Sequence, residues 1–166
     1  MEINIRKAIY ADLPEIVEIL NQAVKTRTQI GYTNEFNLNE RDEWFSDHNR
    51  DDYPILVAER GHKILGWISI SPYRKGRGAL DKTVEVSCFI HNRCQREGIG
   101  NRLLSEALEA SKISGKSVML AIIFNTNIGS ARLLEKHNFK IWGVLPEVAE
   151  LDGKKLNHVY YGKKLQ

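Results

Sequence analysis

A strand, a glycine-bearing loop and a helix follow one another in residues 83–108, and this stretch constrains the fold most. Residues 83–90 (TVEVSCFI) are β-branched and aromatic with one acid, which is typical of a strand. From Ile99 onward, apolar side chains recur at helical spacing. Gly98 and Gly100 stand two residues apart where the helix begins. The stretch therefore predicts a strand that enters a helix through a tight loop.

The glycine-bearing loop suits a phosphate or pyrophosphate. Glycines at a helix start let the backbone approach a ligand, and the free N–H groups of the first turn point at it. A Gly-x-Gly pair alone fits a tight turn without a ligand about equally well. The P-loop pattern is missing, and the dinucleotide pattern would need a glycine at Leu103. What remains is Gln/Arg-x-x-Gly-x-Gly, from Gln95 to Gly100.

The length and the net charge of the chain limit the classes of protein to which it can belong. Its 166 residues suit one domain, residues 1–166, with a proper core. The net charge of +3 and the lack of a Lys/Arg run argue against nucleic acid as the main partner. The first residues match no targeting peptide, and no apolar run reaches membrane-spanning length. We therefore expect a cytoplasmic protein without a membrane partner.

Cys88, His91 and Cys94 form a Cys-x-x-His-x-x-Cys pattern that looks like a metal site. A structural zinc site usually has a fourth ligand and a Cys-x-x-Cys pair, and strand neighbours point to different faces. We therefore expect no metal and two reduced, unpaired thiols.

Periodicity and turn residues predict the order β-α-α-β-β-β-α-β-α-β-β. This order implies a mixed α/β sheet with helices on both faces. Asp12 and Glu15 are expected to form a capping box for the first helix, and Gly115 to end the third. The expected strands span residues 3–9, 55–59, 64–71, 83–90, 117–124, 139–145 and 158–165, and the helices 13–24, 39–46, 99–114 and 128–136.

The loop from Gln95 to Gly100 resembles the coenzyme A pyrophosphate loop of the GCN5-related N-acetyltransferases (GNAT). Most of the chain is similar to the phosphinothricin N-acetyltransferase group of that superfamily. The resemblance implies the GNAT fold: a mixed, mostly antiparallel sheet flanked by helices, a β-bulge or splay at the central strand, and a homodimer. It is carried by residues 20–24 with Thr28, 42–45, 53–59, 66–69 with 72–74, 83–87, 127–130 and 134–139 with Gly143.

The resemblance also implies an acetyl-CoA site. The strand residues after Ser87 would bond the pantetheine arm through their main chains, with an oxyanion donor near Phe89. Asn127 would bond the pantetheine amides, although a role as a helix cap has almost equal weight. The implied acetyl-CoA-binding residues are Cys88, Phe89, Ile90, Gln95, Arg96, Glu97, Gly98, Ile99, Gly100, Asn101, Asn127, Ser130 and Lys136.

Acetylation of an amine needs a base near neutral pH, because amines have pKa values of roughly 8 to 10. Glu85 is the candidate, and strand parity places it on one face with Ser87 and Phe89. An acid among apolar residues is costly unless it is paired or faces a cleft. The alternative is a structural ion pair with Arg74 or Arg77.

Arg74, Arg77 and Thr28 are the candidate substrate-binding residues. An arginine beside the central strand would clamp a carboxylate with two hydrogen bonds, and a solvated loop is an equal alternative. Leu134 stands where the family has His or Tyr near the CoA sulfur, and leucine donates no proton. Tyr160 and Tyr161 are possible substitutes, although strand core is the favoured role for both.

The leading hypothesis is an acetyl-CoA-dependent N-acetyltransferase that acts on a small amine, such as an amino acid or an analogue like methionine sulfoximine. One alternative is acetylation of protein lysines or N-termini, and another is an acyl-CoA-binding sensor without activity. The pattern of residues leaves open the physiological amine, the acyl-chain selectivity and the existence of a general acid.

Overall fold

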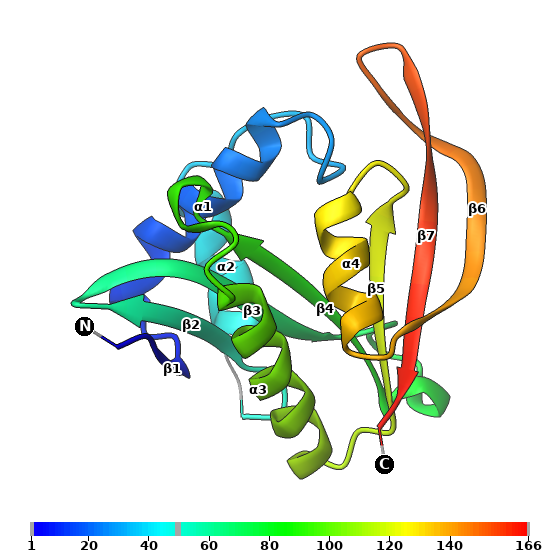
Figure 1. The fold of residues 1–166 in the computed structure, drawn as a ribbon. Helices are drawn as coiled ribbons and strands as arrows, with labels where there is room; N and C mark the ends of the chain where they lie inside the picture. Colours follow the sequence, from blue (N-terminus) through cyan, green and yellow to red (C-terminus); the bar gives the residue numbers. More distant parts are fainter. Residues whose placement is uncertain (1, 49–50, 166) are drawn as a thin grey trace.

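One seven-stranded sheet runs through residues 2–48 and 51–165, which the computed structural model describes (Figure 1). The strand order is β1-β2-β3-β4-β5-β7-β6, and within these residues all neighbours are antiparallel except β4 and β5. The strands are β1 (Asn4–Lys7), β2 (Ile55–Arg60), β3 (Lys63–Pro72), β4 (Thr83–Ile90), β5 (Val118–Phe124), β6 (Lys140–Leu151) and β7 (Lys154–Lys164).

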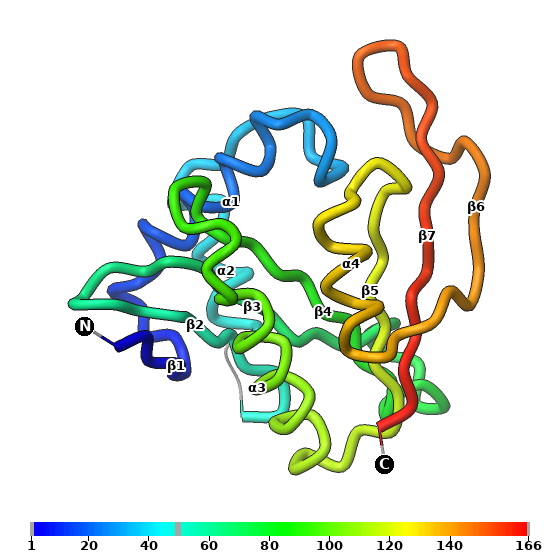
Figure 2. The backbone as a smooth tube through the Cα atoms, in the orientation of Figure 1, coloured from blue at the N-terminus to red at the C-terminus, as the bar shows by residue number. Residues whose placement is uncertain are grey.

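Helices cover both faces of the sheet, as predicted. The backbone tube in Figure 2 follows the chain from β1 through the helices to the long hairpin of β6 and β7. The helices are α1 (Leu13–Lys25), α2 (Asn39–His48), α3 (Ile99–Ile113) and α4 (Ile128–Lys136), with 3-10 turns η1 (Tyr10–Asp12), η2 (Gly78–Leu80) and η3 (Asn92–Cys94). None of the helices in the described ranges is long and apolar enough to cross a membrane.

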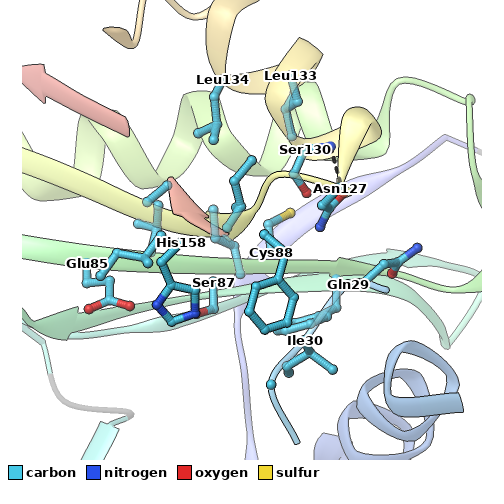
Figure 3. A pocket seen from close by; sticks show the side chains of 18 of the residues that line it. Gln29, Ile30, Glu85, Ser87, Cys88, Asn127, Ser130, Leu133, Leu134 and His158 are labelled. Atoms are coloured by element: carbon cyan, nitrogen blue, oxygen red, sulfur yellow. Dashed lines mark hydrogen bonds between the residues drawn. The ribbon is translucent and has the colours of Figure 1, made fainter. Parts of the chain in front are cut away.

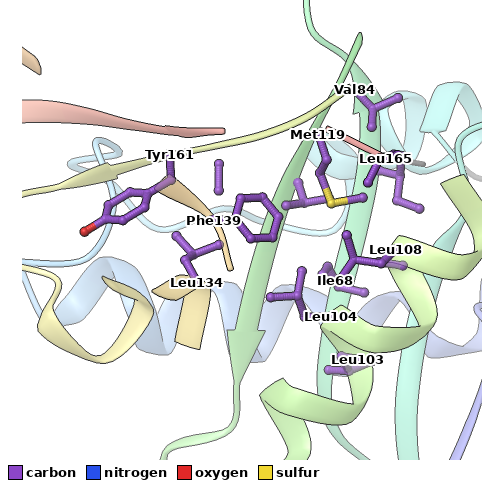
Figure 4. Packing of buried hydrophobic residues seen from close by; sticks show 14 of the residues in the cluster. Ile68, Val84, Leu103, Leu104, Leu108, Met119, Leu134, Phe139, Tyr161 and Leu165 are labelled. Carbon is purple, nitrogen blue, oxygen red and sulfur yellow. The ribbon is translucent and has the colours of Figure 1, made fainter. Parts of the chain in front are cut away.

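The larger core lies between the sheet and the helices α3 and α4 (Figure 4). Leu103 and Leu104 of α3 are 0% and 1% exposed, because the apolar stripe of the helix faces the sheet. Val84 and Val86 of β4 reach into this core, while Phe89 packs in a second core with α1, α2 and Trp67. The predicted alternation of faces along β4 is therefore present.

The start of α1 differs from the prediction, and the expected capping box is wrong. The carboxylate of Asp12 accepts the N–H of Ile9 at 2.8 Å and pairs with Arg6 at 2.7 Å. Glu15 instead accepts the N–H of Ile64, at 3.0 Å. Asp12 has αR backbone angles in the 3-10 turn, and its buried ion pair holds the side chain back toward β1.

The C-terminal hairpin is longer than its pattern indicated. β6 continues to Leu151 and β7 begins at Lys154, with register shifts after Ile141 and Leu145. These shifts break the two-residue alternation from which a strand is recognised in sequence. Asp152 and Gly153 form the turn between the two strands, with φ values of 52° and 75°.

Candidate active site

The ends of β4 and β5 separate, and this opening is the splay predicted at the central strand. Their parallel ladder ends at the pair of Glu85 and Leu120. Beyond that pair β4 stays with β3 as far as Ile90, and β5 stays with β7 as far as Phe124. The β3–β4 ladder has no register shift, so a bulge in β4 is not its cause.

The main-chain groups of β4 that point into the opening follow from the register. The N–H of His91 donates to the C=O of Leu65, and that of Tyr73 to Thr83. Hydrogen-bonded positions alternate in an antiparallel pair, so the odd-numbered residues of β4, Phe89 included, face β3. The groups that face the opening are the N–H and C=O of Cys88 and Ile90 and the C=O of Val86, because the ladder pair of Glu85 and Leu120 engages the N–H of Val86.

A cavity of about 420 Å³ fills this opening (Figure 3). Its walls come from β4 and β5, from β7, from α4 with its preceding turn, and from residues 29–32 between α1 and α2. Glu85 and Ser87 line it together with Val86 and Cys88 from the other face of β4. The open strand edge allows both faces to reach one space, which has the size of a small-molecule site.

Glu85 is the carboxylate of this cavity. Burial raises the pKa of its carboxyl group, and the charge of Arg74 opposes that rise. No salt bridge joins Glu85 to Arg74 or Arg77 in the described part of the chain, so the structural ion pair is not formed. A carboxyl group with a raised pKa in a cavity has the properties of a general base.

The glycine-bearing loop leads into α3 with its first N–H groups outside the helix ladder. Gly98 caps the helix at φ 79°, a left-handed conformation in which glycine is unstrained. Arg102 N–H donates to Gly98 C=O at 3.2 Å, and so starts the helical hydrogen bonds. Glu97 is held by an ion pair with Arg60 at 2.6 Å. A Cβ on Gly100 would lie 3.2 Å from Leu133, so glycine lets α3 approach α4 closely.

The sequence profile of the acetyltransferase (GNAT) family matches residues 16–139, well over half of the chain. The chain belongs to the acetyltransferase (GNAT) family. The family, the fold and the class of enzyme predicted above are therefore confirmed.

Relatives of this GNAT protein align over nearly its whole length. It is 37% identical over 162 residues to YwnH of Bacillus subtilis, which is provisionally named a phosphinothricin acetyltransferase, and the match covers 97% of this chain and 98% of YwnH. It is 35% identical over 158 residues to the L-methionine sulfoximine/L-methionine sulfone acetyltransferase of Pseudomonas aeruginosa, covering 95% of this chain and 91% of that protein. The crystal structure of a GNAT superfamily phosphinothricin acetyltransferase from Sinorhizobium meliloti in complex with AcCoA matches with a TM-score of 0.93, at 26% identity, over 99% of this chain and 89% of that chain.

The turn before α4 contributes two predicted residues, Asn127 and Ser130, to the cavity wall of the GNAT protein. Asn127 Oδ1 accepts the N–H of Ser130 at 3.1 Å, so the helix-cap role is real. An amide has two N–H donors besides that oxygen, so capping does not prevent binding of a ligand. At the other end of α4, His137 Nε2 lies 3.0 Å from Asn101 Oδ1, which brings the adjacent Lys136 beside the start of α3.

The two tyrosines near the end of the GNAT chain have different surroundings. Tyr161 is 4% exposed in the larger core, and its hydroxyl donates to Glu135 at 3.2 Å. Burial raises the pKa of Tyr161. Tyr160 has the opposite parity and lines the cavity, as does the buried, apolar Leu134. Of these two tyrosines, Tyr160 is therefore the one with access to a ligand in the cavity.

The three candidate substrate-binding residues do not line the cavity. Arg74 lies over the ring of Tyr73, 5.2 Å from its centroid, and Arg77 precedes η2. The C=O of Thr28 accepts the hydroxyl of Thr126 at 3.0 Å, so Thr28 ties its loop to the turn before α4. Contacts within the protein therefore account for the positions of Arg74 and Thr28, and no substrate contact is needed to explain them.

Sequence reasoning missed several residues that line the cavity. His158 follows from parity, because it stands two residues from Tyr160 in β7. The segment of residues 29–32 carries no local signal, because only the tertiary fold brings the α1–α2 loop over β5. Further unpredicted lining residues are Gln29, Ile30, Gly31, Tyr32, Ile122, Ile123 and Phe124.

The three residues of the Cys-x-x-His-x-x-Cys pattern lie in different elements: Cys88 is in β4, His91 follows that strand, and Cys94 ends η3. Burial raises the pKa of the Cys88 thiol to about 12, and both Cys88 and Cys94 are free thiols. His91 Nδ1 accepts the N–H of Arg93 at 3.2 Å. Across the described residues, no group of three His, Cys, Asp or Glu side chains is close enough together to hold a metal ion.

Proposed function

We propose that this protein is an acetyl-CoA-dependent N-acetyltransferase that acetylates the primary amine of a small, amino-acid-like molecule, with Glu85 as the general base. The observation that carries the proposal is one cavity between β4 and β5 that holds a carboxylate of raised pKa beside open strand edges. The names of the relatives support the class of substrate, because they include acetyltransferases of phosphinothricin and of methionine sulfoximine.

The residues of this chain fit acetyl-CoA. The free N–H groups that precede Arg102 in α3 suit the pyrophosphate, and Lys136 adds a positive charge beside them. The main-chain groups of Cys88 and Ile90 that face the opening suit the amides of the pantetheine arm, and Asn127 lines the same cavity from the start of α4. When bound, acetyl-CoA supplies an activated acetyl thioester.

Glu85 acts on the acceptor. Most amines are protonated near neutral pH, so attack on a thioester requires removal of a proton. Because burial raises the pKa of Glu85, its carboxylate is a stronger base than an exposed glutamate. A donor N–H of Cys88 or Ile90 at the open edge of β4 would stabilise negative charge on the acetyl oxygen.

The departing thiol needs little help from the chain. A thiol has a pKa of about 8.5, so its thiolate is a tolerable leaving group. Leu134 donates no proton, whereas the tyrosines Tyr32 and Tyr160 both line the cavity. Within the proposal Tyr160 protonates the leaving sulfur, with a modest contribution to rate.

The fixed position of the α1–α2 loop in the cavity wall favours a small acceptor over a peptide. Arg27 forms a two-pronged ion pair with Asp152, at 2.8 and 3.1 Å, and the hydroxyl of Thr126 donates to Thr28. These contacts fasten the α1–α2 loop at the wall of the cavity, whereas a protein acceptor would need an open groove there. A panel of free amines is therefore the first choice of substrates.

The proposal also includes a homodimer, one domain spanning residues 1–166, and the cytoplasm. Exposed apolar side chains on β6 support the dimer, since Ile141, Trp142 and Val148 are 54%, 50% and 55% exposed. One sheet with strands from Asn4 to Lys164 supports the single domain. The free thiols fit a reducing compartment.

The test is release of thiol from acetyl-CoA with a panel of amines, comparing wild type with Glu85→Gln. We expect Glu85→Gln to lower kcat/KM by about 100- to 10,000-fold, the usual contribution of a general base. The wild-type kcat/KM should fall as the pH drops through the raised pKa of Glu85, because only the carboxylate accepts a proton, and the variant should lack that limb.

Glu109→Gln is the matched control, since Glu109 is exposed on α3 and lies outside the cavity. The assignment of Glu85 is excluded if Glu85→Gln keeps the wild-type rate and pH profile while folded. Binding of acetyl-CoA without turnover of any amine would favour the sensor instead.

A further inference from the structure

The acceptor side of the cavity is defined by one face of the sheet. Leu120 pairs with Glu85 and with Gly162 of β7, so even-numbered residues of β5 and β7 share the face of Glu85. His158 stands opposite Phe124 on that face and lines the cavity. Figure 3 shows the carboxylate of Glu85 and the imidazole of His158 on the same side of the sheet.

The charges around this cavity are few. Among the described residues that line it, Glu85 is the one acid, and there is no lysine or arginine. Within the described part of the lining, His158 is the one histidine. An acceptor with a carboxylate therefore has no arginine to bind within the lining, since Arg74 and Arg77 both lie outside it.

His158 is oriented and available for a ligand. Its ring stacks on Phe124 with the centroids 5.1 Å apart and the planes 28° apart, which restricts its rotation. Neither ring nitrogen has a hydrogen-bond partner within residues 2–48 and 51–165, whereas His48, His91 and His137 each have one there and the exposed His62 of the β2–β3 turn has none. An imidazole presents an N–H donor when neutral and two when protonated.

We propose that His158 is the residue that recognises the acceptor, binding the carboxylate of an amino acid whose amine is at Glu85. The inference rests on the proposed function and names its substrate class, which is amines that carry an acid group. An acceptor that carries both an amine and an acid group then makes both contacts, and plain amines bind poorly.

The experiment compares an acid with its neutral counterpart. Thiol release is measured at a fixed pH of 7 with L-methionine sulfone and with the carboxamide of the same amino acid, and the ratio of their kcat/KM values is the readout. We expect His158→Leu to lower this ratio by about 10- to 100-fold, as for loss of a hydrogen bond to a charged group, and mainly through KM. His158→Gln keeps a neutral donor and should retain an intermediate ratio.

Lys154→Leu is the matched control, because Lys154 is an exposed cation of β7 with the same strand parity but outside the cavity. It should keep the wild-type ratio. Thermal melting checks that each variant folds. If His158→Leu does not fold, His158→Gln is the variant whose ratio is compared with wild type.

Three results would overturn the inference. They are an unchanged ratio in His158→Leu, an equal loss of kcat for acid and amide, which indicates a proton relay, and a ratio that falls in Arg74→Ala but not in His158→Leu. If wild type releases no thiol with any amine, the proposed function itself fails, and this result is distinct from the other three.

Discussion

Gly98 allows a test of whether backbone conformation alone shapes the loop before α3. Its φ is 79°, and a Cβ placed on it would meet no atom within 4 Å. Gly98→Ala therefore introduces no clash, and its cost is the strain of a left-handed alanine, about 1 to 2 kcal/mol. Alanine also restricts the unfolded chain, which stabilises the folded state by about 0.4 to 1 kcal/mol. We therefore expect the free energy of unfolding to fall by about 1 kcal/mol in total.

Gly129 provides the matched control. It lies in α4, and a Cβ there also meets nothing within 4 Å, but its φ is not in the left-handed range. Gly129→Ala should therefore stabilise the protein by about 0.5 kcal/mol, because alanine favours a helix. The two substitutions add the same methyl group and should have opposite effects on stability.

The assays are thermal melting and the KM for acetyl-CoA. For a chain of this length, a loss of about 1 kcal/mol lowers Tm by roughly 2 to 4 °C in Gly98→Ala, while Gly129→Ala raises Tm slightly. In the variant without ligand, residue 98 can relax away from φ 79°. Binding of acetyl-CoA must then return the loop to that conformation, so a cost of about 1 kcal/mol raises the KM by up to about fivefold. Equal shifts of Tm in both variants, with no change of KM, would refute the reasoning.

Two further predictions concern the core. Leu103→Ala in the larger core should destabilise the protein by about 2 to 5 kcal/mol in urea unfolding, because it leaves a cavity at a fully buried site. Ile113→Ala at the exposed end of the same helix should change stability by less than about 0.5 kcal/mol, and similar losses for the two would contradict the packing described. Burial raises the pKa of Cys88 to about 12, so at pH 7.5 its thiol should be alkylated by iodoacetamide about 1000-fold more slowly in the folded protein than in urea, as followed by mass spectrometry.

Local patterns accounted for most of the fold. The alternation along residues 83–90 and the helical stripe from Ile99 onward depend on neighbours within a few residues, and both elements are present. Asn138 follows α4 with a φ of 62°, a left-handed conformation that asparagine adopts more readily than most residues. The same short-range logic was wrong at Asp12, because Arg6 competes for the carboxylate that was expected to cap α1.

The sequence by itself determined the order of strands and helices, the glycine-bearing entry to α3 and the choice of Glu85 as the acid of the central strand. Only the tertiary structure decided what surrounds that acid. The α1–α2 loop and β7 reach the cavity through contacts between distant residues, such as Arg27 with Asp152, and no local periodicity encodes such contacts. That is why His158 and residues 29–32 line the site while Arg74 and Arg77 do not.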